Sequence, residues 1–213
     1  MAQINKGKAG LIGLVGAAAI ATVVYFNPAD QKIDLKSHKV QAMIIHCSAT
    51  REGQKNITAK VVDSWHTAPP PVGHNERVNP YNAIIDYNGH VEWFRPWDGD
   101  TIVNKYEVSW GSASYNICSY NICYVGGMNR EYTRAKNTLT VAQDSALMQV
   151  VFDFLRQYPK GYIMGHNQIF AKACPSFDTR QKCLDWGVPI PNIWKINSKY
   201  KIPEKYGKVI FKD

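Results

Sequence analysis

Residues 40–46 read Val-Gln-Ala-Met-Ile-Ile-His, a short apolar run that is rich in branched side chains and ends in a histidine. A short apolar run of this length and composition is typical of a strand buried inside a sheet. A second such run, Ile163 to His166, also ends in a histidine. The sequence therefore predicts a sheet in which two buried strands each place a histidine at their carboxyl end.

Helical and strand patterns alternate irregularly along the rest of the chain. Apolar residues recur with helical spacing in three stretches: Ala59 to His66, Thr140 to Tyr158 and Phe177 to Trp186. Further strand patterns cover Tyr81 to Asp86, His90 to Phe94 and Ile117 to Val125. Asn88-Gly89 joins the first two of these strands as a hairpin turn. We therefore expect a mixed α/β (α+β) fold, a central mixed β-sheet flanked by helices in a single domain.

The composition is that of a folded protein with a basic surface. Hydrophobic residues make up 45% of the 213 residues and charged residues 20%, which excludes a disordered chain. The net charge of +8 favours a polyanionic partner, such as an acidic polymer of the cell envelope. No block of adjacent Lys and Arg occurs, so we expect no binding of nucleic acid. Five cysteines are an odd number, which argues against a disulfide scaffold.

The N-terminus has the pattern of a membrane-targeting segment. Lys6 and Lys8 precede the uncharged residues 9–26, which would form about 27 Å of helix against a hydrocarbon core of about 30 Å. Lysines on the N-terminal side orient the following domain outward. Three interpretations remain open: a signal peptide cleaved near Ala19-Ile20-Ala21, a permanent anchor, or a signal-anchor that later releases. We expect an exported protein, tethered to the inner membrane or released to the periplasm and cell wall.

These patterns divide the chain into four parts. We expect an N-terminal membrane segment at 1–26, a polar linker at 27–39, a catalytic domain at 40–190 and a C-terminal extension at 191–213.

Three side chains are candidate metal ligands: His46, His166 and Cys174. Imidazole and thiolate are ligands that zinc prefers, and a catalytic zinc site has three protein ligands and an open water position. The spacing alone is weak support, because a lone cysteine is more often a small core residue. A histidine at a strand end is likewise more often a polar residue satisfied by hydrogen bonds.

Several segments together resemble one enzyme family. In chain order they are His46-Cys47-Ser48-Ala49-Thr50, Trp65-His66, Pro80 to Ile85, Cys123 to Gly127, and Lys172 to Asp178. Their combination over residues 41–187 is similar to the phage-lysozyme branch of the type 2 N-acetylmuramoyl-L-alanine amidases. Peptidoglycan recognition proteins share that fold.

The resemblance implies a role for each matching residue. His46, His166 and Cys174 would bind one zinc ion, and Tyr81 and Lys172 would be the catalytic tyrosine and lysine. The strand at 117–125 contains no acidic residue, which distinguishes the chain from the glutamate-using recycling branch of the family.

Two departures from the family pattern concern the substrate groove. The proline-rich loop at 68–80 is longer than usual, and Trp110-Gly111-Ser112 replaces a histidine-containing stretch of some phage members. We therefore expect Trp110 and Ser112 to contact substrate.

The resemblance implies a monomer that binds peptidoglycan and cuts the amide bond between N-acetylmuramic acid and L-alanine. A second hypothesis is a module of the same fold that binds peptidoglycan without cutting it. Such proteins often lack the cysteine ligand, so the presence of Cys174 favours the enzyme. A third hypothesis is a virion or membrane-tethered partner protein whose basic surface contacts another protein.

Overall fold

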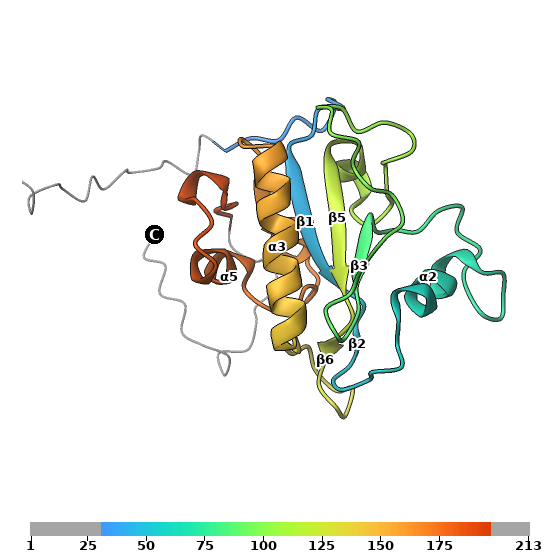
Figure 1. Ribbon diagram of the computed structural model, residues 1–213. Coiled ribbons are helices and arrows are strands. Elements are labelled where there is room, and N and C mark those ends of the chain that lie inside the picture. Colours follow the sequence, from blue (N-terminus) through green and yellow to red (C-terminus); the bar gives the residue numbers. More distant parts are fainter. Residues whose placement is uncertain (1–30, 197–213) are drawn as a thin grey trace, which may run out of the picture. The chain divides into compact units, whose positions relative to one another are not determined.

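A computed structural model describes residues 31–196 of the chain. It contains a five-stranded sheet with the strand order β4-β3-β5-β1-β7 (Figure 1). The strands are β1 (Ala42–Cys47), β3 (Ala83–Ile85), β4 (Val91–Trp93), β5 (Ser119–Tyr124) and β7 (Tyr162–Gly165). β1 is parallel to both neighbours and β5 is parallel to β3, whereas β4 is antiparallel to β3 at the edge. The predicted mixed sheet is confirmed.

One face of the sheet is covered by α3 (Val141–Gln157), the long helix that runs alongside β1 in Figure 1. Thr140 forms a capping box with Gln143, which fixes where the helix begins. Its buried apolar stripe, which includes Leu147 and Phe154, packs against Met43 and other α3-facing residues of the sheet. The helix predicted at 140–158 is therefore confirmed nearly to the residue.

The opposite face of the sheet carries α2 (Ala59–Thr67) and the short α4 (His166–Ile169). α2 packs Ala59 and Val62 against Ile84 and Cys123. Successive side chains of a strand point to opposite faces. His46 therefore lies on the α2 face, while its neighbour Ile45 points toward α3.

The carboxyl-terminal part of the domain consists of α5 (Thr179–Asp185) and the 3-10 turn η3 (Ile190–Asn192). Asp178 caps α5 by accepting hydrogen bonds from the backbone N–H groups of Arg180 and Gln181. Ser176 lies outside the cap, and its Oγ is 3.5 Å from Cys47 Sγ.

Two strand boundaries differ from the prediction. The strand expected at 117–125 begins only at Ser119, because Ala113–Cys118 forms the 3-10 helix η2. His166 does not end β7 but is the first residue of α4. The short apolar runs of the sequence carry no signal for either change.

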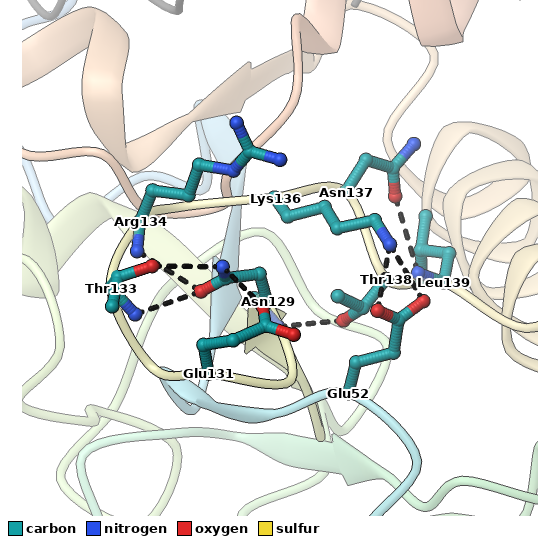
Figure 2. A network of polar contacts seen from close by, with 10 residues as sticks. Glu52, Asn129, Glu131, Thr133, Arg134, Lys136, Asn137, Thr138 and Leu139 are labelled. Carbon is teal, nitrogen blue, oxygen red and sulfur yellow. Dashed lines mark hydrogen bonds and ion pairs between the residues drawn. The ribbon is translucent and has the colours of Figure 1, made fainter.

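A small parallel sheet of β2 (Thr50–Arg51) and β6 (Gly127–Met128) extends the carboxyl ends of β1 and β5. Figure 2 shows the polar network that closes the loop after β6. Asn129 Oδ1 accepts the backbone N–H groups of Thr133 and Arg134, and the Lys136 ammonium pairs with Glu52 at 2.7 Å. The ion pair therefore holds this loop against the segment that follows β2.

The folded unit extends beyond the predicted limits of 40 and 190. Gln31, in the expected linker, donates a hydrogen bond from Nε2 to the carbonyl of Ile193 at 2.9 Å. Trp194, in the expected extension, is only 4% exposed and packs edge-on against Tyr162. The burial of Ile193 and Trp194 explains why the core continues past residue 190.

Within residues 31–196, no helix is long and apolar enough to cross a membrane. The membrane segment predicted at 9–26 and most of the predicted C-terminal extension lie outside the described residues.

Candidate metal centre and active site

The structure brings the three predicted ligands together at one end of the sheet. The ligand atoms of His46, His166 and Cys174 all lie within 4.8 Å of one another. His46 Nδ1 is 3.7 Å from Cys174 Sγ, and the two imidazole rings have centroids 4.5 Å apart. A single metal ion could contact all three atoms.

The strand arrangement explains why residues so far apart in sequence meet. β1 and β7 are adjacent and parallel, and Ile45 pairs with Gly165. The next residue of each segment is a histidine, so both imidazoles emerge at the same edge of the sheet. Cys174 is then held against β1, because the backbone N–H of Cys47 donates to its Sγ at 3.2 Å.

The electrostatic environment keeps both imidazoles neutral. Burial lowers the pKa of His46 well below its usual 6.5, with a further lowering from His166. Burial, assisted by the positive charge of Lys172, lowers the pKa of His166 to about 4. Burial also raises the pKa of the Cys174 thiol. Neutral imidazole is the form that binds a metal, and a bound cation would offset the cost of a buried thiolate. The donor set therefore fits a zinc ion.

These pKa shifts predict how the stability of the metal-free protein depends on pH. The unfolded state binds a proton at His166 near pH 6.5, whereas the folded state does so only near pH 4. The free energy of unfolding should therefore fall as the pH drops from 6.5 to 4, by about 3 kcal/mol from this residue.

Urea unfolding in the presence of a chelator at several pH values checks this expectation. His166→Gln should show a shallower decline over the same range, because it lacks the titrating ring. An equally steep decline in His166→Gln would contradict it.

The two predicted catalytic side chains flank the ligands. The Tyr81 ring centroid is 5.3 Å from that of His46. Burial raises the pKa of the Tyr81 hydroxyl well above its usual 10, with smaller contributions from the nearby Cys123 and Cys174 thiols. Lys172 is exposed, and its charge lowers the pKa of both imidazoles, so its ammonium lies within electrostatic reach of the ligands.

The two expected substrate contacts have different surroundings. Trp110 is 64% exposed. Together with Tyr106 it lines a hollow of about 410 Å³. Ser112 is only 1% exposed, and its Oγ lies 3.2 Å from His46 Nε2. The expectation that Ser112 contacts substrate is therefore corrected, because its hydroxyl faces a candidate metal ligand. For Trp110, contact with substrate stays a prediction.

One residue of the site was missed from the sequence. Asn121 lies in the middle of β5, and its Oδ1 is 2.8 Å from His46 Nε2. The available signal was an amide side chain within the otherwise apolar stretch Tyr120-Asn121-Ile122-Cys123, which a buried strand encloses. Such a side chain requires hydrogen-bond partners.

The fold and the site define a class of protein: a mixed-sheet domain with a buried His-His-Cys candidate metal centre at the carboxyl ends of its parallel strands. Comparison with known families is more specific. The family described as N-acetylmuramoyl-L-alanine amidase matches residues 36–177. The chain therefore belongs to the N-acetylmuramoyl-L-alanine amidase family, and the predicted enzyme class is confirmed.

Curated relatives include two phage endolysins. The endolysin of Enterobacteria phage K11 is 31% identical over 148 residues, covering 68% of this chain and 87% of the relative. The endolysin of Escherichia phage T7 is 30% identical over 142 residues, covering 66% and 83%.

Solved structures share the fold at low sequence identity. The amidase LysC from Clostridium intestinale URNW has a TM-score of 0.53 and 16% identity, covering 78% of this chain and 96% of that one. Drosophila peptidoglycan recognition protein SA has a TM-score of 0.52 and 14% identity, covering 80% and 91%.

Proposed function

We propose that this amidase depends on zinc, cuts the bond between N-acetylmuramic acid and L-alanine in peptidoglycan, and acts as an endolysin. The observation that carries the proposal is the meeting of His46, His166 and Cys174 within 4.8 Å. The endolysin names of the two curated relatives support the biological role.

The side chains around the ligands suit amide hydrolysis. A bound zinc ion supplies a water whose pKa is lowered to about 7 and a Lewis acid for the carbonyl group. Negative charge develops on the carbonyl oxygen as the amide is attacked. The Lys172 ammonium and the Tyr81 hydroxyl are the donors that we assign to this oxygen, and removal of one such donor costs about 10²–10³ in rate.

The hollow beside Trp110 suits a polymer with sugar rings and acidic groups. It is lined by three cationic side chains, Arg77, Arg95 and Lys105. None of the three forms an ion pair with a carboxylate among residues 31–196. The exposed Trp110 ring offers a face on which a sugar can pack. We assign substrate binding to this surface.

The proposal includes export. The uncharged residues 9–26, preceded by Lys6 and Lys8, would deliver the domain to the periplasmic side of the inner membrane, where peptidoglycan is accessible. The chain would act there either tethered or after release.

A non-catalytic peptidoglycan-binding module is the second candidate function. Peptidoglycan recognition proteins are among the structures that share the fold. The complete ligand set, including Cys174, favours hydrolysis instead.

Digestion of purified sacculi by the full-length protein separates these functions. The metal-free protein and the protein reconstituted with zinc are compared, and the products are read by mass spectrometry. We expect about one zinc per chain and new free L-alanine amino ends only with zinc. Full activity without metal would contradict zinc dependence, whereas bound zinc without new amino ends would favour the binding module.

A further inference from the structure

A chain of three buried polar side chains leads from His46 into the interior of the protein. Asn121 from β5, Ser109 from the segment before η2, and Asn82 immediately before β3 are all fully buried. Each contacts the next by a hydrogen bond of 2.7–2.8 Å. The backbone groups around Asn82 determine which atom donates in each hydrogen bond between these three side chains.

The orientation of the Asn82 amide is fixed by the backbone around it. Its Nδ2 lies 2.9 Å from the carbonyl oxygen of Arg95 and 2.6 Å from that of Glu107. Both partners can only accept, so the nitrogen must face them. Its Oδ1 accordingly accepts the backbone N–H of Asn121 at 2.7 Å.

The Asn82 oxygen then determines the direction of the serine hydroxyl. Ser109 Oγ is 2.7 Å from Asn82 Oδ1, which can only accept. A serine hydroxyl has one proton, and this contact uses it. Ser109 Oγ can therefore only accept at its other contact, which is Asn121 Nδ2 at 2.8 Å.

The last step fixes the proton of His46. Because Asn121 Nδ2 faces Ser109, it is Oδ1 of Asn121 that lies 2.8 Å from His46 Nε2. That oxygen can only accept, so Nε2 of the neutral imidazole carries the proton. The unprotonated nitrogen is then Nδ1, the atom that lies 3.7 Å from Cys174 Sγ. Ser112 donates its hydroxyl proton to the same Asn121 oxygen.

We infer that Asn121 is a positioning residue that sets the tautomer and ring orientation of His46 for metal binding. Through Ser109 and Asn82, the backbone carbonyls of Arg95 and Glu107 determine which imidazole nitrogen is free to bind the metal. The inference rests on the proposed zinc site. Partners of this kind typically change metal affinity by about 10–100-fold when they are removed.

The first test compares the zinc affinities of three variants by competition with a chelator. Asn121→Leu removes the acceptor and keeps the branched shape of the side chain, and we expect zinc to bind about 10–100-fold more weakly. Asn121→Asp restores an acceptor for Nε2 and should stay within about threefold of the wild type. Asn192→Leu is the matched control, because this buried amide donates to the carbonyls of Pro159 and Gly161 rather than to any part of the site around His46.

The second test reads the tautomer of His46 directly from ¹⁵N chemical shifts of the imidazole in the metal-free protein. The wild type should show the proton on Nε2, and Asn121→Leu should show a mixture of tautomers. Ser109→Ala should also give a mixture, because the Asn121 amide is then free to turn over. If Asn121→Leu does not fold, the tautomer measured in Ser109→Ala tests the inference in its place.

Unchanged zinc affinity and an unchanged tautomer in Asn121→Leu, or an equal loss of affinity in Asn192→Leu, would overturn the inference. A single Nε2–H tautomer in Ser109→Ala would show that the backbone does not fix the Asn121 amide through Ser109 and Asn82. A wild-type protein that binds no zinc would instead contradict the proposed function, and the tautomer measurement would remain decisive for Asn121.

Discussion

Cys174→Ser should lose its bound zinc and hydrolyse sacculi at least about 10³-fold more slowly, which corresponds to the several kcal/mol that a catalytic metal contributes. The substitution changes a single atom, from sulfur to oxygen, at a site that is partly buried. A serine hydroxyl is a much weaker zinc ligand than a thiolate. The remaining pair, His46 and His166, provides one ligand fewer than a catalytic zinc site normally has.

The neighbouring Cys47 provides a matched control for the same atomic change. Its backbone N–H contacts Cys174 Sγ, but its own thiol faces Ser176 Oγ at 3.5 Å and is not among the clustered ligand atoms. Cys47→Ser should therefore keep about one zinc per chain. Zinc content and the release of L-alanine amino ends are measured in both variants. Retention of zinc and activity in Cys174→Ser would show that its thiolate is not a zinc ligand. Loss of both in Cys47→Ser would show that the effect is not specific to Cys174.

The sequence predicted the elements whose signals are local. α3 was found because Thr140 caps it and an apolar stripe repeats along its length. The hairpin of β3 and β4 was found because Asn88-Gly89 lies between two strand patterns. In both cases the information lies within one contiguous stretch of chain.

The metal site depends on contacts that no local pattern encodes. His46 and Cys174 are 128 residues apart, and their spacing alone predicted little; resemblance to a family was needed to connect them. The pairing of His46 with Asn121 likewise depends on which strands are neighbours. The sequence did not show that Ser112 is buried rather than in contact with substrate, because the segment before η2 turns inward and buries the hydroxyl.

Lys172→Gln should reduce the rate of hydrolysis by about 10²–10³-fold while zinc remains bound, the size of effect expected for loss of one donor to a developing oxyanion. Among residues 31–196, no carboxylate forms an ion pair with Lys172, and its charge acts on both imidazoles. An exposed ammonium without an acidic partner is available to an incoming carbonyl group. Glutamine keeps a polar side chain, but it is one bond shorter and uncharged, so the ammonium donor is lost.

Lys160→Gln is the matched control, because this exposed lysine lies just before β7, at the opposite end of β1 from His46. We expect Lys160→Gln to leave the rate within about twofold of the wild type, since exposed charges this far apart are largely screened. In the metal-free protein, the pKa of His166 should rise in Lys172→Gln alone, because a repulsive charge is removed; NMR titration measures this. A normal rate in Lys172→Gln would rule out its catalytic role. A slow variant with an unchanged His166 pKa would place the ammonium away from the ligands, so the two measurements together test both the role and the position of Lys172.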